Sequence, residues 1–338
     1  MKPRVFLSFV GPSAFMMLLF IALPLASVFW QSFHITQPIL EVVEVEKCSP
    51  GFTGLTCVTE TVSRPVLDEF GKIKTETSFV GLESYKKLIE PERVAAAFSA
   101  GTPSDILSID FWKALRFTLT FTLITLPLVL FFGLLIALVV NNATKRIKGP
   151  VIFVSLLPFI ITPVVGGLSI RWLFIGDGIL TAMLEWMTAS DISMFAQAWT
   201  IELMMMIYRV WHVAPFAFVV FYAGLQTVNQ DTLESAIIDG ASRWERLRYV
   251  ILPHLAPLII FITLIHLMDA YRVFEEIVAF SSQAYVISLQ WLTFDLLVPD
   301  DGGNRAISRA SASSMLTMIG IIILLIFPLR RSWAASRG

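Results

Sequence analysis

The chain has 338 residues, of which 56% are hydrophobic and only 15% charged, and its formal net charge is −1. A soluble domain usually carries about a quarter charged residues. Folding of the chain on itself could not keep so much apolar surface out of water, so lipid must be part of its solvent. The near-neutral charge gives no indication of nucleic acid as a partner. The composition therefore predicts a membrane protein.

Six apolar stretches are long enough to cross a bilayer, which takes about 20 residues for roughly 30 Å of hydrocarbon. They are Val5–Trp30, Phe117–Val140, Val151–Ile170, Leu203–Leu225, Leu255–Ile277 and Ala310–Leu329. The fourth and fifth contain ionisable side chains, and the other four contain none. We therefore predict an all-α membrane protein with six transmembrane helices. The first stretch is too long for the apolar core of a signal peptide and has no small-residue cleavage site behind it, so we expect it to stay as an anchor.

Lysine and arginine residues collect at alternate ends of the predicted helices. The basic clusters lie at residues 2–4, 145–148, 243–248 and 330–337, whereas residues 176–197 carry acids and no Lys or Arg. Loops on the cytoplasmic side of membrane proteins are enriched in basic residues. The pattern predicts a multi-pass protein of the bacterial inner membrane with both termini in the cytoplasm.

The segment between the first two predicted helices is then extracytoplasmic. It contains both cysteines, Cys48 and Cys57, around Ser49-Pro50-Gly51. A Pro-Gly turn can bring such a pair together, and an oxidising compartment would let them join. Two free thiols are the alternative, and we favour the disulfide. The predicted parts of the chain are the N-terminus with the first helix at 1–33, an insert at 34–110 and a transmembrane core at 111–338.

A cytoplasmic loop at residues 230–257 is charged but regularly patterned. Asp231 followed by Glu234 resembles the capping box that starts a helix. Gly240 suits the left-handed position that ends a short helix, and residues 242–245 (Ser-Arg-Trp-Glu) form a second capping box. The pattern predicts two short helices at the membrane surface.

Apolar side chains recur at helical spacing in the second of these helices, at Trp244, Leu247 and Ile251. Pro253 follows where that helix is expected to stop or kink before entering the membrane. An exposed apolar ridge of this kind fits a groove in a partner protein. The alternative is an interfacial amphipathic helix that rests on lipid.

The same loop resembles the "EAA" motif of permeases from binding-protein-dependent ABC importers, written E-A-A-x3-G-x9-I-x-L-P. Matching residues are Glu234, Ala236, Gly240, Leu252 and Pro253, while Ser235 and Val250 replace the first Ala and the Ile. In that family the loop forms coupling helices that dock into a cleft of a cytoplasmic ATPase. The resemblance implies that the contacts to the ATPase come from Glu234, Ser235, Ala236, Gly240, Trp244, Leu247, Ile251 and Pro253.

Other segments resemble the sugar branch of this family, in particular the larger permease of maltose-type importers. They lie at residues 79–85, 111–115, 157–174 and 211–226. The resemblance implies a complex with cytoplasmic ATPase subunits, a second and related permease chain, and an extracytoplasmic solute-binding protein that delivers a sugar. A permease for polyamines or another small solute is the alternative within this class.

Several ionisable residues fall inside predicted helices, where each costs about 3 kcal/mol or more unless it faces a cavity or a partner. Asp269 and Arg272 are three residues apart, and Arg272 and Glu276 are four apart, so each pair could form an ion pair on one helix. We expect a structural pair near the outer interface for Arg272 and Glu276, with Arg209 and Arg272 able to snorkel.

The alternative for the remaining polar groups is a translocation pathway, which we favour for His266 and Asp269. The residues that would line it are Arg209, Trp211, His266, Asp269 and Ser311. For Ser311, close packing of helices is the other interpretation, and the one that we prefer.

Enzyme signatures are absent from the sequence. It contains no G-x-x-x-x-G-K-[ST] phosphate loop, no H-E-x-x-H and no G-x-S-x-G. Two cysteines without a neighbouring histidine argue against a zinc site. We expect a chain with no cofactor or metal that is not an enzyme itself. Two rivals are a secondary transporter, which should show inverted repeats, and a membrane-embedded enzyme, for which only His266 and Asp269 come near a catalytic pair.

Overall fold

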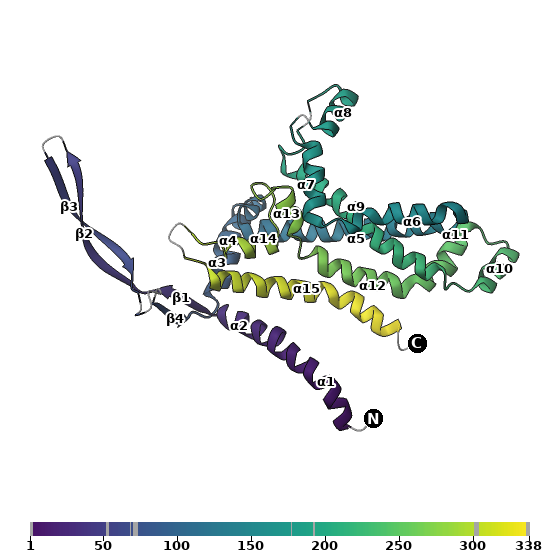
Figure 1. Cartoon of the computed structure of the whole chain (residues 1–338), viewed down its shortest axis with the longest axis horizontal. Helices are drawn as coiled ribbons and strands as arrows, with labels where there is room; N and C mark the ends of the chain where they lie inside the picture. Colours follow the sequence, from purple (N-terminus) through teal and green to yellow (C-terminus); the bar gives the residue numbers. More distant parts are fainter. Residues whose placement is uncertain are drawn as a thin grey trace. The chain divides into compact units, whose positions relative to one another are not determined.

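The computed structural model describes residues 3–51, 54–67, 69, 74–176, 178–191, 193–300 and 304–335. Helices account for most of it (Figure 1). The chain divides into two compact units. Unit 1 comprises Met1–Leu88 and Leu296–Met315, and unit 2 comprises Ile89–Asp295 and Leu316–Gly338.

Unit 1 begins with one apolar helical run. It consists of α1 (Pro3–Met17), a π-helical turn (Leu18–Ala22) and α2 (Leu23–Gln31). Within Phe9–Gln31, no residue of the most apolar window is buried inside the protein. Apolar side chains that find no cover in the fold need a lipid environment, so this helix is suited to span the membrane.

The insert after this helix contains β-strands, so the prediction of an all-α protein is wrong in this part of the chain. Strand β1 (His34–Pro38) pairs antiparallel with β4 (Thr75–Phe79), and β2 (Leu40–Gly51) pairs antiparallel with β3 (Gly54–Pro65). Runs of Val, Thr and Glu alternate along β2 and β3, which suits a two-stranded ribbon. Helix α3 (Glu83–Ile89) follows.

The β2–β3 ribbon places Cys48 directly opposite Cys57. Pro50 and Gly51 belong to β2 and pair with β3 residues, so they are part of the ladder rather than the turn that we expected. The hairpin register is what brings the two cysteine backbones together. Their side chains lie outside the described part of the structure, and the disulfide stays a prediction.

Unit 2 is helical. Its described elements are α4 (Pro91–Ser99), a 3-10 turn (Pro103–Ser108), α5 (Asp110–Asn141), α6 (Lys145–Ile160), α7 (Pro163–Phe174), α8 (Ile179–Thr188), α9 (Ala198–Leu225), α10 (Gln230–Ile238), α11 (Arg243–Arg246), a π turn (Leu247–Ile251), α12 (Leu252–Ala270), α13 (Glu275–Ala279), α14 (Leu289–Asp295) and most of α15 (Ile307–Ala335). Helices α10 and α11 lie at the opposite end of this unit from α13 and α14 (Figure 1).

Five helices in the described part of the chain are long and apolar enough to cross a membrane. A sixth crossing requires α6 and α7 to count as one span, although they meet at an angle of 94°. The predicted helix Val151–Ile170 is therefore broken rather than continuous. Its break follows from Pro163, because the residue before a proline is driven out of the α conformation and the proline has no N–H for the helix ladder. Ile161 and Thr162 are accordingly extended, with ψ near 135° and 142°.

The predicted helix Leu255–Ile277 also ends earlier than expected. Helix α12 stops at Ala270, and α13 starts a new short helix at Glu275. Glu275 and Glu276 therefore do not continue the apolar helix that precedes them. The separation turns α13 back against α7, where Gly167 lies close to Ala279.

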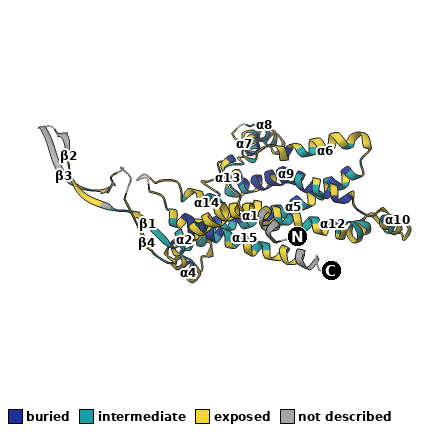
Figure 2. Cartoon of the chain, turned by 60° about the horizontal axis from the view of Figure 1, so that its bottom comes forward, coloured by how far each residue is buried: buried dark blue, intermediate teal, exposed yellow. Residues whose placement is uncertain are grey.

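The core of unit 2 forms along α9, the most deeply buried of its spanning helices (Figure 2). Helix α5 packs closely along it. At one point the backbones are so close that a Cβ added to Gly133 would lie 2.5 Å from Cβ of Ala217 and 3.0 Å from the backbone nitrogen of Phe218. Small residues are what permit such contact between membrane helices.

The contact at Gly133 gives a test of this packing. Gly133→Ala should destabilise the protein by about 1–3 kcal/mol, because an added methyl group overpacks the α5–α9 interface. Ala217→Gly in the same chain should restore part of the loss. The measurement is the thermal unfolding midpoint in detergent. Gly149→Ala is the control, since no described atom outside its own stretch of α6 lies within 4 Å of the added Cβ. Equal midpoints for the variants at Gly133 and Gly149 would contradict the packing.

Candidate functional site

A cavity of about 490 Å³ lies inside unit 2, bordered by the end of α6, the start of α7 and by α9, α12 and α13. Its size falls within the ~300–1,000 Å³ of small-molecule sites. Most of its wall is apolar. The polar side chains that line it include Arg209, His212, His266, Asp269 and Glu275.

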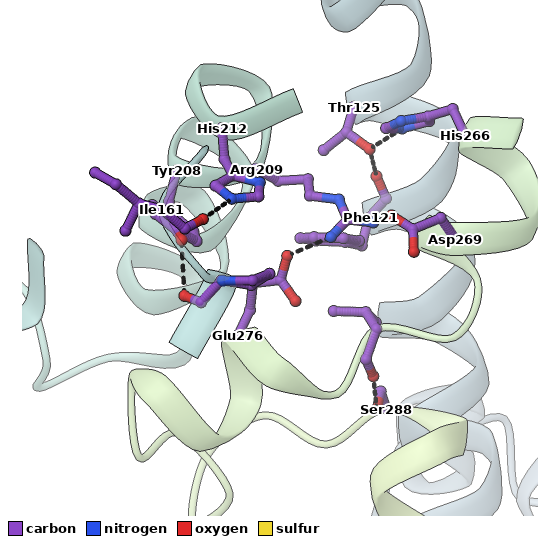
Figure 3. Close-up of polar contacts among 12 residues, drawn as sticks. Phe121, Thr125, Ile161, Tyr208, Arg209, His212, His266, Asp269, Glu276 and Ser288 are labelled. Carbon is purple, nitrogen blue, oxygen red and sulfur yellow. Dashed lines mark hydrogen bonds and ion pairs between the residues drawn. The ribbon is translucent and has the colours of Figure 1, made fainter. Parts of the chain in front are cut away.

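The guanidinium of Arg209 lies at the centre of the polar contacts (Figure 3). Its Nη1 donates to Oε1 of Glu276 at 2.7 Å, and its Nη2 donates to Oδ2 of Asp269. The side chains of Arg209 and Glu276 are only 4% and 1% exposed, whereas that of Asp269 is 58% exposed. The buried carboxylate of Glu276 thus holds the arginine from within the protein, whereas the carboxylate of Asp269 faces the cavity.

This arrangement corrects the predicted ion pairs. Asp269 and Glu276 both pair with Arg209 of α9 rather than with Arg272. Nε of Arg272, in the turn after α12, donates to the carbonyl of Met268 on α12 instead. The reason is the early end of α12, which leaves Arg272 in the turn between α12 and α13 and removes the four-residue helical spacing to Glu276. Sequence reasoning therefore assigned Glu276 the wrong partner and left it out of the candidate site.

His266 lies beside the ion pairs, one turn before Asp269 on α12. Its Nε2 lies 2.9 Å from Oγ1 of Thr125, whose own proton is directed at the carbonyl of Phe121 (Figure 3). The histidine must therefore be the donor in this contact. Nδ1 of the buried ring has no partner in the described structure. A neutral ring fits these contacts, whereas a protonated ring would leave a buried N–H unpaired.

Two side chains of α9 cap the break between α6 and α7. Nε2 of His212 donates to the carbonyl of Ile161 at 2.9 Å, and the hydroxyl of Tyr208 donates to the carbonyl of Pro163 at 2.7 Å. Gly166 makes room for the tyrosine, since a Cβ there would lie 2.6 Å from its hydroxyl. Broken helices persist at membrane depth only where the freed backbone groups are satisfied. The break is therefore a hydrogen-bonded part of the cavity wall.

Two other predicted pathway residues lie elsewhere. Trp211 lines a separate apolar cavity of about 510 Å³ between α5, α6 and α9. Ser311 belongs to unit 1, where its hydroxyl lies 3.5 Å from Oε1 of Gln31. The structure brings together Arg209, His266 and Asp269 of the predicted set.

The predicted loop forms two short helices joined at Gly240. Gly240 has φ of +80°, which confirms the left-handed position. The reciprocal capping box between Ser242 and Glu245 is also confirmed. The first helix is capped by Asn229, whose side chain accepts from the backbone N–H of Asp231, so the box predicted from Asp231 and Glu234 is wrong. An asparagine one position before the helix satisfies the free N–H group more directly.

The second helix of the loop does not stop at Pro253. It runs on through the π turn Leu247–Ile251 into α12. The π turn already displaces the i→i−4 hydrogen-bond ladder just before Pro253, so the missing N–H of the proline falls where that ladder is interrupted and the helix continues. Ile251 packs against the apolar core rather than facing outward.

Apolar side chains are exposed on this loop, which is mostly yellow at α10 in Figure 2. Trp244 is 65% exposed, Ile238 84% and Tyr249 68%. Ile238 and Tyr249 were missed by sequence reasoning, which took Trp244, Leu247 and Ile251 as the ridge. The signal that could have found Ile238 was its place two residues before Gly240, at the last position of α10.

The described fold is that of a multi-pass membrane protein. The family model described as "Binding-protein-dependent transport system inner membrane component" matches residues 96–332. The chain belongs to this family.

Relatives with curated names carry permease descriptions. The chain is 27% identical to the probable ABC transporter permease protein YesP of Bacillus subtilis over 77% of this chain and 80% of YesP. It is 31% identical to the trehalose transport system permease protein SugA of Mycobacterium tuberculosis over 60% of this chain and 59% of SugA, less than two thirds of that relative.

One solved structure shares the fold along nearly the whole chain. It is a chain from a bacterial ABC transporter involved in the import of the acidic polysaccharide alginate, with 18% identity and a TM-score of 0.68 over 98% of this chain and 96% of that one. The likeness shows that the two chains share a fold.

The Arg209 contacts give a test of the site's electrostatics. Arg209→Met should cost about 3–5 kcal/mol of stability, because it leaves the buried carboxylate of Glu276 without its partner. Asp269→Asn should cost less, since that side chain is largely exposed. The double variant Arg209→Met/Glu276→Met should recover much of the loss. Thermal unfolding in detergent measures all three, and a larger loss in Asp269→Asn than in Arg209→Met would contradict the assignment.

Proposed function

We propose that the chain is the membrane-spanning permease subunit of an ATP-driven importer, and that it carries sugar-like solutes delivered by an extracytoplasmic binding protein. The coupling helices would be α10 and α11, with ATP hydrolysis on a separate cytoplasmic subunit. A second, related permease chain would complete the pathway.

The geometry of the loop at residues 230–257 carries this proposal. Two short helices meet at a left-handed glycine, and each has a side-chain cap at its start. Trp244 and Ile238 offer exposed apolar side chains beside the exposed carboxylate of Glu234. Helices that present apolar anchors in this manner bind grooves of partner proteins. Contacts from Ser235, Ala236 and Leu247 would surround these anchors.

The orientation follows from the same loop. Basic residues at 145–148 and 243–248 lie at the end of unit 2 that holds α10 and α11. The positive-inside tendency therefore supports a cytoplasmic position for the loop, and the basic residues at 2–4 and 330–337 support the same position for both termini. The insert at residues 34–110 would then face the compartment that contains the binding protein.

The relatives support a sugar as the solute, since SugA is described as a trehalose permease. The cavity around Arg209, His266 and Asp269 would form this chain's part of the pathway. Closure of the ATPase on ATP would draw the coupling helices together and favour the outward-facing state of the bundle. Such coupling shifts a population between two states that bind the partner differently.

The loop can be tested at Gly240. Gly240→Asp should strain the junction, because a side chain at positive φ costs about 1 kcal/mol or more, and it should hold the two helices away from their groove. We expect less ATPase retained by the purified permease and slower uptake of sugar into proteoliposomes. Gly101→Asp is the matched control, since Gly101 also has positive φ and open space but lies in the insert.

Loss of the ATPase in the Gly240 variant alone would support docking through the loop. Equal ATPase retention and uptake in the two variants, at normal levels, would mean that α10 and α11 rest on lipid, and the importer proposal would lose the observation that carries it.

A further inference from the structure

Carboxylates outnumber basic side chains at the cavity of unit 2. Asp269 and Glu275 line it, and Glu276 lies directly behind Arg209. Arg209 is the one Lys or Arg among the described residues of its lining. Two of these carboxylates pair with Arg209, and the third, Glu275, lines the cavity, so the three carboxylates and one guanidinium carry a formal charge of −2.

The two histidines of the cavity do not offset this charge. Each places its Nε2 proton on an oxygen acceptor, at Thr125 for His266 and at Ile161 for His212. In both rings Nδ1 is buried and has no partner in the described structure. Protonation would add an unpaired N–H in each case, so both rings fit their surroundings as neutral groups.

The two carboxylates that hold Arg209 differ in what they can do. Glu276 is almost fully buried and keeps the guanidinium in place. Asp269 keeps an exposed carboxylate at the cavity surface, with one oxygen on Arg209. Such a carboxylate can accept hydrogen bonds from hydroxyl or ammonium groups of a solute, but it repels another anion across the same cavity.

We propose that this cavity selects neutral and amino-bearing saccharides and excludes acidic ones, with Asp269 as the specificity-determining residue. The inference rests on the proposed function, in which the cavity is part of the pathway. The proposed selectivity excludes the kind of solute described for the structural relative, whose transporter imports an acidic polysaccharide. Two chains with the same fold can differ in the charge of the solute that they accept, because the charge of the cavity depends on a few side chains.

The charge of the cavity can be measured without knowing the solute. Ile265 lines the cavity on α12, one turn before Asp269, and is 42% exposed. Ile265→Cys would be made in a chain with Cys48→Ser and Cys57→Ser, and purified at full length in a non-ionic detergent. Its rate of modification would be compared for a cationic and an anionic methanethiosulfonate, bearing trimethylammonium and sulfonate groups. Each rate is divided by the rate with free 2-mercaptoethanol.

The normalised ratio of cationic to anionic rates should be about 10 at low ionic strength and should fall as salt is added. Asp269→Asn should lower it about threefold, whereas Asp269→Glu, which keeps the charge, should leave it unchanged. Ile160→Cys, on the α6 side of the cavity, gives a second position if the first variant does not fold.

A normalised ratio of one or less at both positions would overturn the charge selectivity. An unchanged ratio in Asp269→Asn would overturn the role of Asp269. Neither result bears on the importer proposal, which fails separately if the chain neither retains an ATPase nor supports uptake.

Discussion

The buried guanidinium of Arg209 is the constraint on which the site depends. A charge inside an apolar bundle costs several kcal/mol unless it is paired and hydrogen-bonded. Arg209 comes from α9, Asp269 from the end of α12 and Glu276 from α13. Pairing therefore fixes where α12 must end and how α13 must turn back. The same contacts leave Asp269 on the cavity side. The pairing of Arg209 therefore stabilises the fold and also gives the cavity its polar surface.

Helix α9 also supplies the side chains that cap the break between α6 and α7. The break between α6 and α7 frees backbone carbonyls that must find donors at this depth. Tyr208 and His212 supply them from the same helix that carries Arg209. A shift of α9 would thus change both the ion pairs and the capped break. Only a few residues separate the end of this helix from the start of α10.

Local chemistry made part of this structure predictable from sequence. Gly240 and the Ser242 capping box were found because each depends on neighbouring residues only. The apolar spans were found because their length and composition are set by the bilayer. The partner of Glu276 was missed because it lies 67 residues away on another helix. The break before Pro163 was missed because an apolar run looks continuous when proline is read as one more apolar residue.

The most direct measurement is the structure of the assembled transporter in its nucleotide-free and ATP-bound states. The account predicts that Arg209 and Glu276 stay paired in both, and that the carboxylate of Asp269 faces an aqueous cavity in at least one. Separation of Arg209 from Glu276 between the states, or an Asp269 side chain closed off from water in both, would contradict it.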